Sequence, residues 1–151
     1  MALPHLTKEA REAFLAEPHI AAISVARDDD RPPLTAPFWY TYEPGGNLTF
    51  FTGTQGRKAR KTALIEKAGV LSILDQKEQF PYKYVSVEGT VVRIDRPPSA
   101  DQMLAIVRRY LPEEQTQGVV GAELANPGPD LVLFTIRPDR WFTADFSGAA
   151  G

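Results

Sequence analysis

The segment Tyr82–Ile94 (YKYVSVEGTVVRI) constrains the fold most strongly, because apolar and polar residues alternate along most of its length. A period of two is typical of a β-strand with one buried face, and Val85, Val87 and Val91 share that face. Gly89 interrupts the alternation, which predicts a β-bulge or the close approach of another backbone. The segment therefore predicts a long strand that packs one face into a core.

Other segments of the chain have the composition of strands, with β-branched and aromatic residues between turn-forming residues. They are Ile20–Ala26, Leu34–Tyr42, Asn47–Thr52, Val70–Asp75, Leu131–Arg137 and Arg140–Phe146. Pro37 favours an edge or a bulge for the second of them, and the turn Glu43-Pro44-Gly45-Gly46 predicts a hairpin with the third. Pro138-Asp139 predicts a turn between the last two, which would then form a closing pair of strands.

Helices are predicted between these strands. They span Thr7–Leu15, Arg57–Lys67, Ser99–Leu111 and Glu113–Leu124. Thr7 and Ser99 are suited to cap their helices, and Gly69 to end the second one. Because the strands mostly follow one another through turns, we expect antiparallel pairing in a small, mainly β barrel with peripheral helices. No repeat or linker divides residues 1–151, which predicts a single domain.

The composition excludes several classes of function. The chain of 151 residues has no cysteine, which excludes disulfides, thiolate metal sites and cysteine nucleophiles. Its 17 basic and 19 acidic side chains give a net charge of −2, so we expect neither a nucleic-acid nor a membrane partner. The first residues lack the basic start and apolar run of a signal peptide, which predicts a cytoplasmic protein. The sequence assigns no metal ligand and no catalytic residue.

The densest chemical feature is a basic cluster, Gly56-Arg57-Lys58-Ala59-Arg60-Lys61, at the start of a predicted helix. Free N–H groups and the helix dipole favour an anion at a helix N-terminus, whereas cations alone oppose the dipole. Cations three or four residues apart, such as Lys58 and Lys61, can converge on one phosphate. The cluster therefore predicts phosphate binding, and the alternative is a solvated basic face balanced by Glu66.

Aromatic side chains gather on the predicted hairpin, in Phe38–Tyr42 and Phe50-Phe51. Most of them are expected in the core. Because neighbours along a strand point to opposite faces, Trp39 and Tyr40 cannot both face the same way. One face can therefore present an aromatic surface to a planar ligand or to a partner subunit.

Three isolated titratable residues have a plain structural explanation. His5 and His19 lack metal-ligand spacing and are expected at the surface. Glu88 lies in an apolar strand beside Gly89, where a paired structural acid is favoured over a group near a site.

Taken in order, these segments resemble the pyridoxamine 5′-phosphate oxidase-like split β-barrel superfamily over roughly residues 9–146. The resemblance rests on four pieces: AAISVA (21–26), PFWYTYEPGGNLTFFT (37–52), FFTGTQGRKARKTALIEKAGVLSIL (50–74) and YKYVSVEGTVVRI (82–94). Their order and spacing carry it, above all the run from the FFT strand through the Arg-Lys pair to a Val-Glu-Gly strand. It implies a split barrel of six to seven mostly antiparallel strands.

The resemblance also implies a homodimer with two flavin-type cofactors between the subunits, either FMN or the deazaflavin coenzyme F-420. A basic pair grips the cofactor phosphate in such proteins. One alignment assigns this role to Arg57 and Lys58, and another assigns it to Arg60 and Lys61.

Three further residues match positions that approach the cofactor in the superfamily. The backbone near Thr52 approaches the ring, and Tyr84 stands where many members carry a ring-contacting glutamine. Trp141 resembles a C-terminal tryptophan that reaches the cofactor, in many members from the neighbouring subunit. The tail RWFTADFSGAAG lacks the segment with which pyridoxamine phosphate oxidases hold their substrate, so vitamin B6 oxidation is not predicted.

These features predict an oxidoreductase that passes a hydride between FMN or F-420 and a small organic substrate. The rival prediction is a non-enzymatic flavin, F-420 or haem binding or storage protein, because a fold does not decide a function. Nucleic-acid binding is the weakest alternative, since the cations are confined to one short segment.

Overall fold

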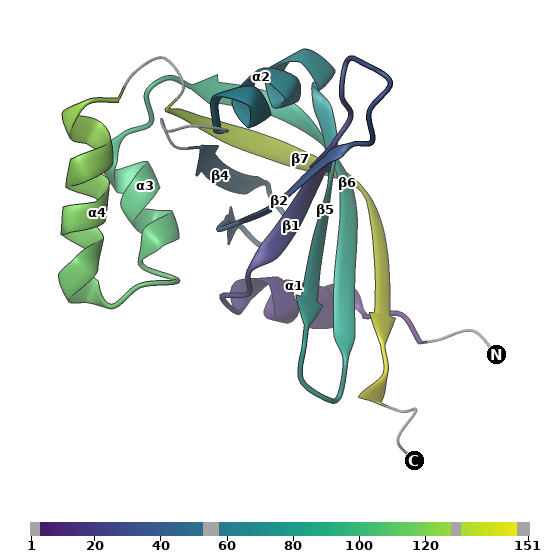
Figure 1. Cartoon of the computed structure of the whole chain (residues 1–151). Helices are drawn as coiled ribbons and strands as arrows, with labels where there is room; N and C mark the ends of the chain where they lie inside the picture. The colour runs from purple at the N-terminus through teal and green to yellow at the C-terminus, as the bar shows by residue number, and fades with distance from the viewer. Residues whose placement is uncertain (1–3, 53–57, 128–130, 148–151) are drawn as a thin grey trace.

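A computed structural model describes residues 4–52, 58–127 and 131–147 and contains one antiparallel sheet surrounded by helices (Figure 1). The strands are β1 (Ala21–Val25), β2 (Leu34–Phe38), β3 (Thr41–Tyr42), β4 (Leu48–Thr52), β5 (Val70–Lys77), β6 (Lys83–Asp95) and β7 (Val132–Asp145). The helices are α1 (Lys8–Ala16), α2 (Lys58–Ala68), α3 (Ala100–Val107) and α4 (Glu113–Ala125). The 7-stranded sheet runs in the order β2-β1-β5-β6-β7-β4-β3, which confirms the predicted mainly β, antiparallel fold.

A single segment, residues 34–42, closes this sheet into a split barrel. Its first part, β2, pairs with β1, whereas β3 pairs with β4 at the opposite end of the strand order. The sequence predicted one continuous strand here, but the strand breaks at Trp39 and Tyr40. Pro37 lies in β2, an edge strand, as predicted.

The two longest strands, β6 and β7, pair along nearly their whole length. The prediction of two closing strands with a turn at Pro138-Asp139 was wrong, because β7 continues through these residues. Gly89 pairs with Pro138 and Glu88 with Arg140, so the register shifts there and Asp139 has no opposite residue. A Cβ at Gly89 would lie 2.4 Å from Cγ2 of Ile136 and 3.0 Å from the carbonyl oxygen of Arg137, and the second contact confirms the predicted close approach of another backbone. Long-range pairing with β6 therefore overrides the local turn signal, and β7 bulges instead of reversing.

The core fills the barrel with apolar side chains from the inner faces of the strands. Two helices close its ends: Phe14 and Leu15 of α1 and Leu64 and Ile65 of α2 join the buried cluster. Figure 1 shows α2 and α1 at opposite ends of the sheet. The side chain of Thr7 caps α1 by accepting the N–H of Ala10 at 3.1 Å, as predicted.

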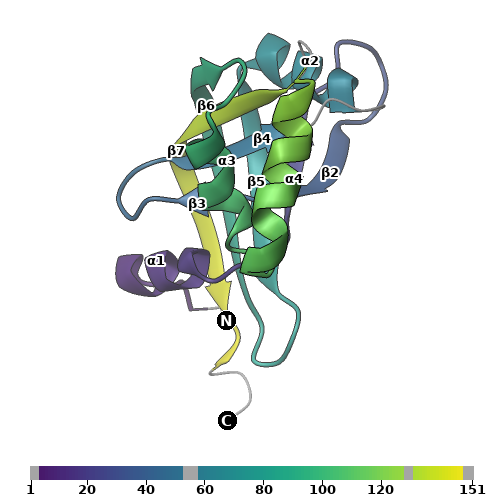
Figure 2. The ribbon, with the colours of Figure 1, turned by 90° about the vertical axis from the view of Figure 1, so that its left-hand side faces the viewer.

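The other two helices, α3 and α4, pack side by side on the outer face of the sheet (Figure 2). Ser99 begins α3 with a complete capping box, and a second apolar cluster lies beneath the pair. Phe51, on the outer face of β4, packs against this cluster. Further along the sheet the outer face carries exposed apolar side chains, with Val70 57%, Leu74 39% and Phe142 48% exposed.

Candidate functional site

A hollow of ≈ 430 Å³ lies beside the break in the strand, and we call it the Trp39 hollow. Its lining includes Ile20, Pro37, Trp39, Phe51, Lys61 and Glu123. The walls are mostly apolar and aromatic, and Lys61 and Glu123 are the charged residues that line it within the described part of the chain. A hollow of this size and composition suits a planar organic ligand.

The break in the strand fixes Trp39 at this hollow. Its indole ring stacks on the ring of Tyr110, with centroids 5.0 Å apart and planes 5° apart. The neighbouring backbone of Tyr40 lacks a strand partner, and two side chains replace it: Tyr110 Oη accepts from the Tyr40 N–H at 3.3 Å, and Arg109 donates to the Tyr40 carbonyl at 2.6 Å. Side chains that follow α3 thus hold the break rigid.

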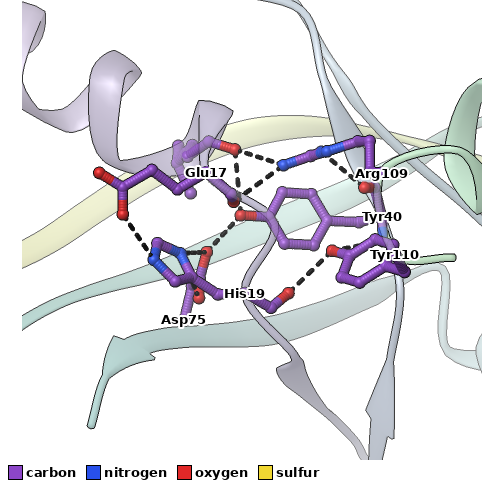
Figure 3. A network of polar contacts seen from close by, with 7 residues as sticks. Glu17, His19, Tyr40, Asp75, Arg109 and Tyr110 are labelled. Atoms are coloured by element: carbon purple, nitrogen blue, oxygen red, sulfur yellow. Dashed lines mark hydrogen bonds and ion pairs between the residues drawn. The ribbon is translucent and has the colours of Figure 1, made fainter. Parts of the chain in front are cut away.

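Tyr40, the residue after Trp39 in the strand break, belongs to a buried polar network (Figure 3). The Tyr40 hydroxyl donates to the buried carboxylate of Asp75, and Nδ1 of His19 lies 3.3 Å from each oxygen of that carboxylate. Nε2 of His19 lies 2.9 Å from Glu17 Oε2. Burial raises the pKa of the Tyr40 hydroxyl above its ordinary value, and the Asp75 charge adds to this, so the phenol stays protonated and donates.

His19 is a central member of this network, which corrects the prediction of a surface histidine. Its side chain is 16% exposed and stacks on Phe14 with centroids 4.4 Å apart. The hydrogen bond to Asp75 raises its pKa above the ordinary 6.5, against burial, which lowers it. Because carboxylates face both ring nitrogens, the doubly protonated ring fits best. The sequence carried no local signal for this, since Asp75 lies on a strand 56 residues further along the chain.

The predicted basic cluster divides into parts. Arg57 lies outside the described residues, and Lys58 begins α2 with a side chain that also lies outside them. Arg60 points to the acidic turn after β1, where its guanidinium lies 3.8 Å from Asp28. Lys61 lines the Trp39 hollow. The two residues of the second predicted pair therefore have different surroundings.

Two of the predicted ring-contact residues lie on different faces of the sheet. Thr52 ends β4 with a side chain that is 1% exposed, and its hydroxyl lies 2.7 Å from that of Thr62 on α2. Tyr84 lies in β6 between Gln76 and Ala144.

The third, Trp141, lines a separate hollow of ≈ 280 Å³, which we call the Trp141 hollow. Its lining includes Lys8, Arg11, Tyr42, Asn47, Arg137 and Trp141. None of the described residues lines both hollows, so one chain does not bring Trp141 together with Lys61 in one cavity.

Among residues 4–52, 58–127 and 131–147, no group of three or more histidine or acidic side chains is arranged to hold a metal ion. No helix in this part of the chain is long and apolar enough to cross a bilayer.

Solved structures share this architecture. An F-420 reductase matches with a TM-score of 0.63 and 23% identity, over 87% of this chain and 94% of the other. A conserved hypothetical protein from Mycobacterium tuberculosis matches with a TM-score of 0.72 and 14% identity, over 100% and 92%. A FAD and heme binding protein from Mycobacterium smegmatis matches with a TM-score of 0.61 and 16% identity, over 92% and 71%. At these identities the likeness shows the fold alone.

Sequence comparison gives the family. No curated protein matches the chain. The family model described as pyridoxamine 5′-phosphate oxidase matches residues 6–145, from before α1 to the end of β7. This match spans every described strand and helix. It agrees with the split barrel, which β2 and β3 close by pairing with opposite ends of the sheet. The chain therefore belongs to the pyridoxamine 5′-phosphate oxidase-like family.

Proposed function

We propose that the chain is an oxidoreductase that holds a flavin-type cofactor, FMN or F-420, with the ring system in the Trp39 hollow. The proposal rests on one observation. Flat apolar side chains and Lys61, a cation of the basic cluster, line the same cavity. Both cofactors combine a planar ring system with a phosphate, so the residues present fit a group of this kind. The likeness to an F-420 reductase and to a FAD and heme binding protein supports the same class of cofactor.

The phosphate would lie at the start of α2. Arg57, Lys58 and Lys61 are the cations proposed to hold it, because Lys61 lines the hollow and the other two lie four and three residues before it in the chain. Arg60 is left out of this group, since its guanidinium lies 3.8 Å from Asp28 and 3.9 Å from Asp29. A helix N-terminus and several cations together favour a phosphate strongly.

The bound cofactor would supply the hydride chemistry, and the protein would supply position and a dry environment. Trp39, held flat by Tyr110, forms a rigid wall for the ring, and Phe51 and Pro37 exclude water beside it. The backbone near Thr52, at the end of β4, remains a proposed ring contact.

A homodimer is part of the proposal. The outer-face row Pro37–Ala22–Leu74–Ser86–Phe142 crosses five strands in register and ends at the Trp39 hollow through Pro37. A second subunit on this exposed apolar face would cover the mouth of the hollow and bury Leu74 and Phe142. Tyr84, on the same face as Phe142, then remains a candidate for contact with the partner's cofactor, whereas Trp141 lines the separate Trp141 hollow.

The alternative is a cofactor carrier, favoured by the likeness to the FAD and heme binding protein. Haem needs an axial ligand, and both ring nitrogens of His19 already face carboxylates. His5 bonds the carbonyl of Thr143 through Nδ1 at 2.9 Å and does not line the Trp39 hollow. A flavin or F-420 carrier is therefore the better form of this alternative, and turnover of the bound cofactor with an added donor and acceptor separates it from the enzyme.

Titration of the purified protein with FMN and then with F-420, followed by absorbance, tests the proposal. Lys61→Gln should weaken binding about tenfold through loss of one charge-assisted contact. Glu123→Gln should strengthen it slightly, because a carboxylate lines the same hollow. Arg60→Gln is the matched control and should change it less than about twofold.

Two outcomes would overturn the assignment. One is that neither cofactor binds the wild-type protein. The other is that Lys61→Gln and Arg60→Gln have equal effects. The double substitution Arg57→Ala with Lys58→Ala should abolish cofactor retention while the protein stays folded, as circular dichroism would report.

A further inference from the structure

The Trp141 hollow combines three cations from distant parts of the chain. Lys8 and Arg11 come from α1, and Arg137 comes from β7 beside the bulge. No acidic residue of the described ranges lines the hollow. Like charges brought together in this way repel one another unless an anion joins them.

The cations of α1 have no protein anion to neutralise them. Within residues 4–52, 58–127 and 131–147, neither Lys8 nor Arg11 forms an ion pair, whereas Arg137 donates to Asp139 at 2.9 Å. Nε of Arg11 is buried and donates to no atom of the described residues. A buried donor without an acceptor costs stability, and an anion beside the Arg11 guanidinium would offset this cost by charge.

The aromatic residues of the hollow give it a flat wall. The Arg11 guanidinium lies 4.2 Å from the centre of the Trp141 ring, and Tyr42 packs edge-on against the same ring with centroids 6.0 Å apart. The volume of ≈ 280 Å³ lies just below the range for drug-sized ligands, so the hollow admits a compact molecule.

We infer that the Trp141 hollow is a second binding site, which takes a small single-ring aromatic anion, a carboxylate or a phosphate ester. The anionic group would meet Arg11 and Lys8, and the ring would pack on Trp141 and Tyr42. The inference does not rest on the proposed cofactor site, because none of the described residues lines both hollows.

Tryptophan fluorescence tests this site directly. The chain has 2 tryptophans, so Trp39→Phe leaves Trp141 as the sole reporter. In that protein, benzoate and phenyl phosphate are titrated separately. Inorganic phosphate is the control for an anion without a ring, and benzyl alcohol is the control for a ring without a charge. We expect saturable quenching by at least one aromatic anion, and the better of the two identifies the anionic group.

Variants locate the binding. Arg11→Gln should weaken it about tenfold and Lys8→Gln about threefold, because each removes one charged contact. Arg108→Gln removes a surface cation that pairs with Glu113 and should change nothing. Lys61→Gln should also leave aromatic-anion binding unchanged, which separates this site from the cofactor site. Thermal unfolding establishes that each variant is folded.

Three results would overturn the inference: no saturable quenching by either aromatic anion, equal quenching by benzyl alcohol, or unchanged affinity in both Arg11→Gln and Lys8→Gln. Inorganic phosphate binding as tightly as phenyl phosphate would overturn the assignment to an aromatic ligand.

Discussion

The two tryptophans of this chain lie in hollows built on opposite principles. Trp39 stacks on Tyr110, and a buried network of hydrogen bonds holds the strand break beside it. Trp141 lies beneath Arg11 in a hollow with three cations and no acidic lining residue among those described. In the first hollow, hydrogen bonds from Arg109 and Tyr110 hold the wall in place, whereas in the second, Lys8 and Arg11 form no ion pair with the described residues.

This difference indicates two kinds of preorganisation. A rigid apolar wall favours a planar ring system by shape and by exclusion of water. A pair of cations without an anionic partner among the described residues, Lys8 and Arg11, favours an anion by charge, and their mutual repulsion lowers stability when the hollow is empty. Substitutions that damage one hollow and spare the other are therefore the sharpest tests.

The largest effect is expected from Asp75→Ala, which removes the acceptor shared by Tyr40 and His19. Breaking a buried charged pair costs about 3 kcal/mol, so the free energy of unfolding should fall by that amount in urea denaturation. Flavin binding should fall with it, and aromatic-anion binding at Trp141 should not. Asp30→Ala, in an exposed turn, is the matched control. Wild-type stability in Asp75→Ala would contradict the structural role of the network.

The opposite selectivity is expected from Gly89→Ala. The new Cβ would lie 2.4 Å from Cγ2 of Ile136 and 3.0 Å from the carbonyl of Arg137, so β7 must shift where it lines the Trp141 hollow. Overpacking of this kind costs about 2 kcal/mol, and aromatic-anion binding should weaken more than flavin binding. Gly118→Ala in α4 is the control, because a Cβ there meets nothing within 4 Å and alanine favours a helix. Equal weakening at both hollows would refute their independence.

The parts of the fold that follow from local patterns were predictable from the sequence. The alternation in residues 82–94 predicted β6 and its irregular pairing at Gly89, and Thr7 and Ser99 predicted the starts of α1 and α3. Each of these depends on residues a few positions apart. The prediction of a turn at Pro138-Asp139 was wrong because the conformation there depends on pairing with β6. The neighbouring residues of β7 do not reveal this long-range pairing.

The candidate site was predictable only in part. The sequence shows the basic cluster as one group, but helix α2 turns Arg60 towards Asp28 and Lys61 into the lining of the Trp39 hollow, which depends on how the helix packs. The buried network was missed altogether, since Tyr40 and Asp75 meet across 35 residues of chain. Sequence spacing shows such pairs only when both members lie on one element.

A smaller effect is expected from Tyr110→Phe, which keeps the ring on Trp39 but removes a hydroxyl that donates to the His19 carbonyl at 2.8 Å and accepts from the Tyr40 N–H. One hydrogen bond is worth about 1 kcal/mol. In a Trp141→Phe background the emission of Trp39 should shift towards that of exposed indole. Tyr82→Phe, at an exposed tyrosine, should alter neither quantity. No change in stability or emission would show that the stack alone holds Trp39.

The smallest effect is a pH dependence of stability from His19, whose pKa is raised above 6.5 by its hydrogen bond to Asp75. The folded state holds the proton more tightly than the unfolded state, so this stabilisation is complete below the unfolded pKa and is lost as the pH rises through the folded pKa. Burial opposes the shift, which keeps the effect small. Urea denaturation from about pH 5 to about pH 9 should show the difference in stability between wild type and His19→Gln shrinking as the pH rises. A difference that grows with pH would mean that the ring is held neutral, and the network behind the Trp39 hollow would then lack its central charge.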